Sequence, residues 1–332
     1  MLNPIWLTGF EPFRYVMAPM AGITDTVFRL LIRELGAQVV ISELLSAEGL
    51  VRGGQRTREM LKFDERERPV GIQLFGGDET TLIQAAQIVE ADGADFVDLN
   101  LGCPVKKIVC DGGGAAWLKD PVKLGRLLSN LRKAIGIPLT IKTRTGWDET
   151  SINIHEIVSI ASDSGVSWVA IHGRTRAQGY SGDANWDLIR SVAEKSPIPI
   201  IGNGDLVSAS AAREKIESGA CHAVMIGRGA LKDPWIFQEL LGKAVDRDFI
   251  QLIRRHFDLA VEKKDRRRAF LSLKKFLSWY ASGFPNCSQF RASVFATEEI
   301  DSLWKISQDY FESVNHLSPV TDCSNFLMGG HG

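Results

Sequence analysis

The chain has 332 residues, which is too long for one small domain but suits an α/β barrel of about 250 residues with an appended domain. Its 45% hydrophobic and 24% charged residues are ordinary for a globular protein, and a formal net charge of -1 leaves the partners open. Five scattered cysteines without C-x-x-C or zinc-like spacing argue against a disulfide framework and a metal site. No apolar stretch approaches the roughly 18 to 20 residues of a membrane span, and the N-terminus lacks a signal-peptide pattern, so we expect a soluble, cytoplasmic protein.

Short runs rich in Val, Ile and Leu recur along the first two thirds of the chain, each followed by a segment with helical spacing. Their apolar residues are nearly continuous, as in parallel strands that are covered on both faces. The predicted strands span residues 15–18, 38–42, 70–75, 96–100, 139–143, 168–172, 198–202 and 223–226. Amphipathic helices are predicted between them, for example over 80–92, 124–135 and 208–218. Several of the helical segments end in glycine, where a C-cap belongs: Gly36, Gly93, Gly165 and Gly219.

Eight strands that alternate with helices predict a closed (β/α)8 TIM barrel, which we place over residues 1–242. The alternative is an open doubly wound sheet. No G-x-G-x-x-G follows the first strand and no G-x-x-x-x-G-K-[ST] occurs, so the usual nucleotide-binding forms of that alternative are not supported.

The strand pattern stops after Pro234, and the remaining sequence is helical. Phe270, Leu273, Leu277 and Tyr280 fall on one face of a helix. Between positions 251 and 280, nine Lys and Arg residues face only three acidic ones. We therefore predict a small all-α domain over residues 243–332 with one basic side. A solvated helix end is the alternative interpretation of the run 266–268.

Unusual residues gather at the carboxyl ends of the predicted strands, where barrel enzymes place their functional groups. Glycine-rich turns follow strands seven and eight, and their backbone N–H groups favour a phosphate site, although tight turns alone would also explain them. The polar residues Gln73, Lys142 and His172 offer an amide and two potential cations, which suits the N1–C2=O edge of a reduced flavin. Cys103 follows strand four, where a protonated thiol can serve as a general acid; a small buried hydrophobic residue is the alternative.

Five segments together resemble the tRNA-dihydrouridine synthase family, and most of all its bacterial B-type branch. They are N-L-G-C-P-V-K-K at 100–107, K-T-R-T-G-W at 142–147, H-G-R-T-R-A-Q-G-Y-S-G at 172–182, N-G-D at 203–205 and I-G-R-G-A-L-K-D-P-W at 226–235. The resemblance runs from residue 17 to about 237 and resumes more weakly over 274–280. The barrel with a helical domain is also that family's architecture.

The resemblance implies FMN as cofactor, NADPH as reductant and tRNA as substrate, with uridine reduced to 5,6-dihydrouridine. Cys103 would protonate C5 of the uracil while flavin N5 delivers hydride to C6, and Asn100 would contact the same base. The implied cofactor-binding residues are Ala18, Pro19 and Met20 at the isoalloxazine, Gln73, Lys142 and His172 at its polar edge, and Asn203, Gly204, Asp205, Gly227 and Arg228 at the ribityl phosphate. The sequence departs from the family at Cys110-Asp111, where a basic residue is common, so this loop lacks a positive charge that the family offers to RNA.

A stacked uridine must be extracted from folded RNA before it can meet a flavin, so phosphate contacts are needed. The expected RNA-binding residues are Lys106, Lys107, Arg144, Arg174, Arg176, Lys274 and Lys275. Charge reversal at Lys274 and Lys275 is expected to weaken tRNA binding without changing flavin content.

Two other functions are compatible with parts of the sequence. An FMN barrel that acts on a small pyrimidine, similar to dihydroorotate dehydrogenase, would not need residues after Asp246. A non-catalytic RNA-binding protein on a retained barrel would tolerate Cys103→Ala. No short motif reports which uridine is modified, whether NADH replaces NADPH, or the oligomeric state, for which a monomer without an obligate protein partner is the default.

Overall fold

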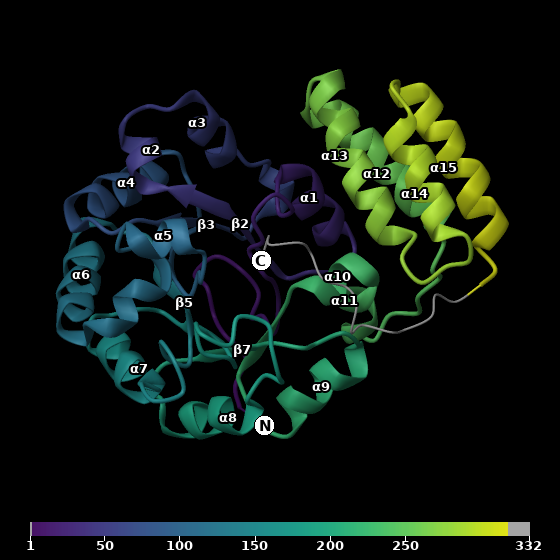
Figure 1. Ribbon diagram of the computed structural model, residues 1–332. Coiled ribbons are helices and arrows are strands. Elements are labelled where there is room, and N and C mark those ends of the chain that lie inside the picture. Colours follow the sequence, from purple (N-terminus) through teal and green to yellow (C-terminus); the bar gives the residue numbers. More distant parts are fainter. Residues whose placement is uncertain (1, 318–332) are drawn as a thin grey trace.

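The computed structural model describes residues 2–317, and it confirms the predicted fold class. Eight parallel strands close into a barrel in the order β1 to β8 (Figure 1). Their bounds are β1 Tyr15–Met17, β2 Val39–Ser46, β3 Val70–Phe75, β4 Phe96–Leu101, β5 Leu139–Arg144, β6 Val169–His172, β7 Ile200–Asn203 and β8 Ala223–Ile226. All eight predicted strands are present. β2 extends to Ser46 rather than Ser42, because its pairing with β3 shifts register between Ile41 and Leu44 and then continues.

Helices surround the barrel and cover the outer face of the strands (Figure 1). They are α1 Thr26–Glu34, α2 Ala47–Val51, α3 Gln55–Leu61, α4 Glu79–Ala91, α5 Lys106–Cys110, α6 Pro121–Ala134, α7 Ile154–Asp163, α8 Trp186–Lys195, α9 Ala209–Glu217, α10 Arg228–Lys232 and α11 Ile236–Leu240. The four glycines predicted to follow helices all have positive φ: 101° at Gly36, 87° at Gly93, 77° at Gly165 and 75° at Gly219. This backbone conformation ends a helix at little cost only when no Cβ is present.

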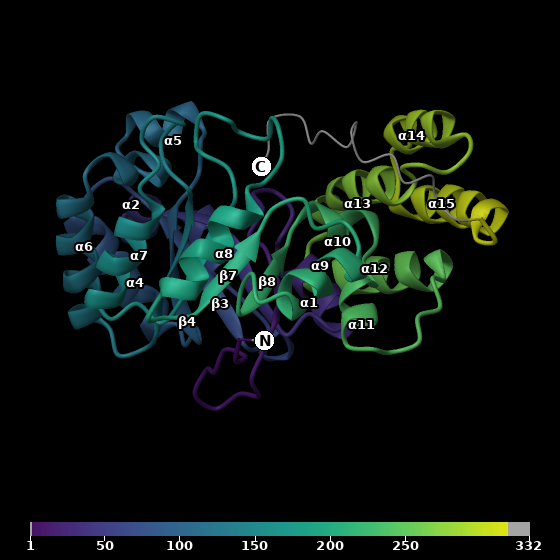
Figure 2. The same ribbon diagram turned by 90° about the horizontal axis from the view of Figure 1, so that it is seen from below.

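The N-terminal segment closes the bottom of the barrel. Ile5 pairs with Phe13 in an antiparallel bridge, and both side chains are buried. Phe13 packs edge-on against Trp168 inside the barrel, with ring centroids 5.5 Å apart, and Trp168 packs in turn against Phe96 at 5.1 Å. Figure 2 shows this segment at the end of the barrel marked N. The amino ends of the strands are therefore filled, and a ligand has to enter at the carboxyl ends.

Four further helices follow the barrel and pack together beside it: α12 Phe249–Lys263, α13 Arg266–Tyr280, α14 Cys287–Ala296 and α15 Ile300–Val314 (Figures 1 and 2). Helix α12 lies against α1. Phe28 of α1 stacks on Phe276 of α13 with ring centroids 4.9 Å apart. Removing all residues after Asp246 would expose this apolar surface of α1, so that truncation does not separate the two enzyme hypotheses cleanly. Residues 318–332 of the predicted helical domain, including Cys323, lie outside the described residues.

Several basic residues of the helical domain are neutralised by acidic residues of the barrel. Arg255 pairs with Glu34 at 2.6 Å, and Lys264 pairs with Asp25 at 2.5 Å. Further pairs join Lys263 to Asp64 and Arg268 to Glu59. The positive surplus expected from counting residues 251–280 is therefore reduced, because part of it faces the barrel. Most of these pairs are exposed enough to contribute little stability, but they orient the two surfaces.

Lys274 has a structural role that the sequence did not predict. It lies on α13 with only 9% of its surface exposed, and its ammonium donates to the carbonyl oxygens of Phe295, at 3.2 Å, and Thr297. It thus holds the end of α14. The prediction that Lys274 contacts RNA phosphates is therefore corrected, because its ammonium is already bound within the protein.

We expect Lys274→Glu to lower the free energy of unfolding by about 3–5 kcal/mol, because it places a buried carboxylate against two carbonyl oxygens. Lys275→Glu, at the exposed neighbouring position, should change it by less than about 0.5 kcal/mol. Urea unfolding of the two variants measures the difference. Equal stabilities would contradict the structural role of Lys274.

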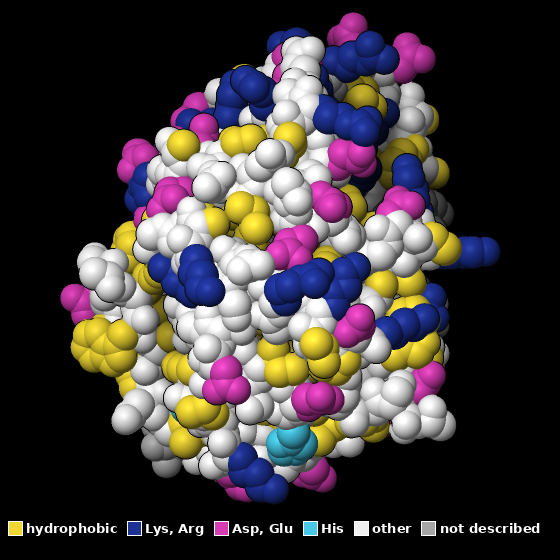
Figure 3. Space-filling view, turned by 90° about the vertical axis from the view of Figure 1, so that its left-hand side faces the viewer, with side chains coloured by type: hydrophobic (Ala, Val, Ile, Leu, Met, Phe, Trp, Pro, Cys, Tyr) yellow, Lys and Arg dark blue, Asp and Glu magenta, His cyan; other side chains and the backbone are white. Residues whose placement is uncertain are grey.

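The side of the barrel opposite the helical domain carries positive and negative side chains interspersed with one another (Figure 3). Among residues 2–317, no helix is long and apolar enough to cross a membrane.

Candidate functional site

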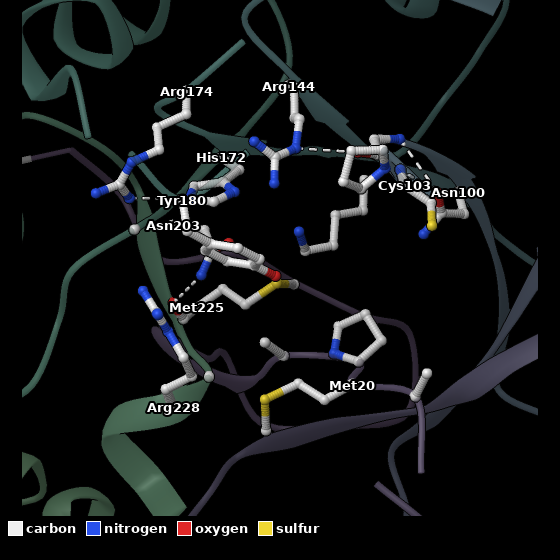
Figure 4. Close-up of a pocket in the computed structure, with 18 of the residues that line it drawn as sticks. Met20, Asn100, Cys103, Arg144, His172, Arg174, Tyr180, Asn203, Met225 and Arg228 are labelled. Carbon is white, nitrogen blue, oxygen red and sulfur yellow. Dashed lines mark hydrogen bonds between the residues drawn. The ribbon is translucent and has the colours of Figure 1, made fainter. Parts of the chain in front are cut away.

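A cavity of about 710 Å³ lies at the carboxyl ends of the strands (Figure 4). The loops after β1, β4, β6, β7 and β8 all contribute to its wall. Every residue predicted to bind the cofactor lines it: Ala18, Pro19, Met20, Gln73, Lys142, His172, Asn203, Gly204, Asp205, Gly227 and Arg228. Asn100, Cys103, Arg144 and Arg174 line the same cavity. The structure thus brings together residues that are more than 200 positions apart in the sequence.

One wall of the cavity is apolar. It is formed by Ala18, Pro19 and Met20 after β1, with Met225 from β8. Gly227 faces this wall, and a Cβ at that position would lie 3.5 Å from both Ala18 Cβ and Met20 Sδ. The lack of a side chain there leaves the surface between β8 and β1 open to a flat, apolar ring.

Two consecutive residues of the turn after β7, Gly204 and Asp205, have positive φ angles, which most side chains disfavour. Gly204 has φ 129°, and a Cβ there would lie 2.5 Å from Ala184 Cβ. Asp205 follows with φ 55°, and its carboxylate accepts from Ala184 N at 2.8 Å and pairs with Arg174 at 2.8 Å. Arg228, at the start of α10, lies 3.8 Å from the same carboxylate. The turns after β7 and β8 therefore meet around one cluster of charged groups.

Cations outnumber anions in the wall of this cavity. Five cationic side chains and two carboxylates line it: Lys142, Arg144, Arg174, Arg228 and Lys232 against Asp183 and Asp205. Burial, with a smaller contribution from Arg144, lowers the pKa of the Lys142 ammonium to about 8. Within residues 2–317 no hydrogen bond or ion pair holds that ammonium. A half-buried cation without a partner is costly unless a ligand supplies an acceptor or a negative charge, so this wall fits an anionic ligand.

Of the two potential cations predicted at this edge, His172 is not charged at neutral pH. Burial and the charges of Arg144, Lys142, Arg174 and Arg228 hold the pKa of its imidazole well below the usual value. The ring is therefore neutral at pH 7, with one nitrogen that donates and one that accepts, and its Nε2 atom lies 3.4 Å from Nη1 of Arg174, which can only donate. Lys142, together with the arginines, carries the positive charge.

Cys103 and Asn100 lie together on the β4 side of the cavity (Figure 4). The Oδ1 atom of Asn100 accepts from the backbone N–H groups of Cys103, at 2.8 Å, and Gly102, at 3.2 Å, which fixes the turn that carries the thiol. Cys103 is half-buried, and burial raises the pKa of its thiol above the usual value. A thiol that stays protonated at neutral pH is suited to donate a proton rather than to act as a nucleophile.

We expect iodoacetamide to alkylate Cys103 at least about tenfold more slowly than the exposed Cys110 at pH 7.5, because alkylation requires a thiolate and access. Peptide mass spectrometry over a time course measures both rates in one sample. The buried Cys221 serves as an unreactive reference, because burial raises the pKa of its thiol to about 12. Faster labelling of Cys103 than of Cys110 would contradict a protonated acid.

The residues predicted to bind RNA occupy three different settings. Arg144 and Arg174 are buried: Arg144 donates to the carbonyl oxygens of Gly102, Thr175 and Gly179, and Arg174 holds Asp205. Lys106, Lys107, Arg176, Lys274 and Lys275 do not line the cavity. Lys106, at the start of α5, and Lys275 are exposed, whereas Arg176 lies 4.4 Å from the ring centre of Trp147. Arg144 and Arg174 can therefore meet only a group that enters the cavity.

Two residues near the site received no role from the sequence. Tyr180 lies over the cavity between Arg228 and Arg144, with the guanidinium carbons 4.6 and 5.6 Å from the ring centre (Figure 4). Its place in the loop after β6, between Gly179 and Gly182, is the sequence feature that could have indicated a residue of the site. Asp98 lies behind the cavity wall on β4 and is buried; as an acidic residue within an apolar strand it could have been noticed.

The closed barrel, the plugged lower end and the cation-rich cavity at the carboxyl ends of the strands define a (β/α)8-barrel enzyme. A family model described as dihydrouridine synthase (Dus) matches residues 16–315. The chain therefore belongs to the dihydrouridine synthase family, which confirms the family and the enzyme class predicted from its motifs.

Curated relatives match most of the chain. A probable tRNA-dihydrouridine synthase of Rhizobium leguminosarum bv. phaseoli is 39% identical over 273 residues, which cover 82% of this chain and 86% of that protein. The tRNA-dihydrouridine synthase B of Pseudomonas aeruginosa is 32% identical over 309 residues, 90% of this chain and 93% of that protein. A probable tRNA-dihydrouridine synthase of Rickettsia conorii is 33% identical over 289 residues, 84% of this chain and 87% of that protein.

Solved structures with the same fold are distant in sequence. The histamine dehydrogenase from Rhizobium sp. 4-9 superposes with a TM-score of 0.57 at 14% identity, over 77% of this chain and 50% of that one. A 2-naphthoyl-CoA reductase superposes with a TM-score of 0.56 at 13% identity, over 72% of this chain and 52% of that one. The chain thus spans about half the length of these structures, and the likeness supports the barrel fold alone.

Proposed function

We propose that this chain reduces the C5–C6 double bond of uridine in tRNA to give 5,6-dihydrouridine, with bound FMN as the flavin and NADPH as the reductant. The observation that carries the proposal is a single cavity that holds the Cys103 thiol, beside Asn100, together with the half-buried cation Lys142, which has no hydrogen bond or ion pair within residues 2–317. The names of the curated relatives support the same reaction.

The residues around the cavity fit FMN. Ala18, Pro19 and Met20 would lie against the ring system, and the open surface at Gly227 leaves room for it. Gln73, Lys142 and His172 would face its polar edge, where Lys142 supplies a positive charge. Arg228, together with the turn Asn203-Gly204-Asp205, would hold the phosphate. The number of cations in the wall supports a ligand that carries negative charge.

When bound, FMN supplies the hydride, from its N5 atom, for C6 of the uracil. Cys103 donates the proton to C5, and the raised pKa of its thiol keeps that proton available at neutral pH. The thiolate that remains is stabilised by the positive charges of Arg144 and Lys142, which favour the ionised form of this thiol. Asn100, whose carbonyl oxygen holds the Cys103 turn, would place its amide against the base.

The target uridine has to leave the RNA stack to enter this cavity, at a cost of a few kcal/mol. Exposed basic residues such as Lys106 and Lys275, with the half-buried Arg176 in the loop after β6, would contribute phosphate contacts that offset this cost. We propose residues 243–332 as the tRNA-binding domain, and the cytoplasm as the location, since tRNA and NADPH meet there. The sequence contains no dinucleotide motif, so the choice of NADPH follows the family.

The proposal is tested by measuring dihydrouridine at each tRNA position by mass spectrometry. The tRNA is taken from cells that lack the gene, with and without a returned wild-type copy. Loss of dihydrouridine at one or more positions, restored by the returned copy, is the expected result and also identifies the modified uridine. Unchanged dihydrouridine at every position would contradict the tRNA assignment. Activity of the purified protein on free uracil or orotate would then point to a small pyrimidine as substrate.

A further inference from the structure

A continuous chain of hydrogen bonds runs behind the cavity wall from β5 to the Cys103 turn. Thr140 Oγ1 donates to Asp98 Oδ1 at 2.6 Å, and Gln73 Nε2 donates to Asp98 Oδ2 at 2.6 Å. Asn100 Nδ2 then donates to Gln73 Oε1 at 2.9 Å. The Oδ1 atom of Asn100 accepts from the N–H groups of Gly102 and Cys103. Asp98 does not line the cavity, whereas Gln73 and Asn100 do.

In this row of hydrogen bonds, the groups at the two ends determine which atom donates and which accepts in every bond. Backbone N–H groups can only donate, so Asn100 must turn its oxygen toward Gly102 and Cys103, and its NH2 group toward Gln73. Gln73 must then present its oxygen to Asn100 and its own NH2 group to Asp98. The group at position 98 therefore has to be an acceptor, and a carboxylate satisfies this whichever way it is rotated.

We propose that Asp98 is a positioning residue: by accepting from Gln73 it holds that amide in the polarity that its bond to Asn100 requires, so that both amides keep an N–H group available to ligands of the cavity. The inference rests on the proposed function for the identity of those ligands. Each amide nitrogen keeps a second N–H that the chain of bonds does not use. These two donors, beside the ammonium of Lys142, select carbonyl oxygens and unprotonated ring nitrogens.

The consequence for the substrate follows from the donor pattern. A uracil carbonyl that faces Asn100 meets an N–H group, whereas the 4-amino group of cytosine would set N–H against N–H. An unsatisfied buried donor is costly, so the wall discriminates by polarity as well as by shape. Asp98 supports this without touching the ligand, through Gln73.

Replacing Asp98 by leucine and by asparagine separates this role from a role of its charge. Asp98→Leu removes the acceptor, and we expect the kcat for tRNA reduction to fall about 10- to 100-fold and the FMN dissociation constant to rise, while KM for tRNA stays within about threefold. Asp98→Asn can still turn its oxygen toward Gln73 while its NH2 group donates to the Thr140 hydroxyl, so it should keep both values within about threefold. Thr140→Val, which removes the other donor to Asp98, is the matched control and should also retain both values.

Three results would overturn the proposal. The first is a wild-type kcat and FMN dissociation constant for Asp98→Leu. The second is an equal loss in Asp98→Leu and Asp98→Asn, which would indicate that Asp98 acts through its charge on Lys142. The third is a loss in Thr140→Val as large as that in Asp98→Leu. If Asp98→Leu does not fold, neutron diffraction from crystals of the wild-type holoenzyme tests the orientation of the Gln73 amide. We expect deuterons on the Gln73 atom that faces Asp98. Deuterons on the atom that faces Asn100 would contradict the proposal. Wild-type protein that binds FMN but does not reduce tRNA would contradict the proposed function instead, and the FMN dissociation constants of the two Asp98 variants would still test this inference.

Discussion

Cys103→Ala is expected to lower the rate of dihydrouridine formation by about 10²- to 10⁴-fold, the range that general-acid catalysis contributes. The thiol is the proton donor that the proposed reaction assigns to C5, and Cys103 lines the cavity beside Asn100. Flavin content should not change, because the bond that fixes this turn joins Asn100 to the backbone N–H of residue 103 and survives the substitution. Single-turnover reduction of a tRNA transcript, followed by mass spectrometry, measures the rate.

Cys110→Ala is the matched control for this experiment. Cys110 is exposed at the end of α5 and does not line the cavity, so its loss should leave the rate within about twofold. A Cys103→Ala enzyme with wild-type rate would show that another group supplies the proton, and a colourless Cys103→Ala protein would show that the thiol supports cofactor binding instead.

The barrel and most of the candidate site could be predicted from the sequence because both depend on local patterns. Parallel strands buried on both faces are continuous apolar runs, and β3 and β8 have the predicted bounds. The residues that follow each strand must gather at one end of a closed barrel, so the cavity that contains Gln73, Lys142 and His172 follows from topology alone.

The charge state and partners of individual side chains could not be predicted, because they depend on neighbours that are distant in the sequence. His172 was a potential cation, but its burial and four nearby cations lower the pKa of its imidazole well below the usual value. Lys274 belongs to a basic run, yet it is buried against the carbonyl oxygens of Phe295 and Thr297. The same limit applies to Arg255, whose partner Glu34 lies on a barrel helix.

Lys142→Met is expected to weaken FMN binding and to lower kcat by about 10²- to 10³-fold, as the loss of one preorganised electrostatic group does in other enzymes. Lys142 brings its positive charge to the cavity without a hydrogen-bonding partner within residues 2–317. Burial disfavours that charge in the ligand-free protein, as the lowered pKa of about 8 indicates. Methionine has a similar shape and no charge, so it removes the interaction while filling the same space.

The stability of the same variant provides a second, opposite readout. FMN-free Lys142→Met should unfold at the same or a higher urea concentration than the FMN-free wild type, since it relieves the cost of burying an ammonium that has no partner among the described residues. FMN should stabilise the wild type more than the variant, because stabilisation by a ligand grows with its affinity. Lys106→Met, which alters an exposed residue outside the cavity, should change neither quantity. A Lys142→Met protein that loses stability without FMN but binds FMN normally would assign Lys142 to the fold rather than to the cofactor.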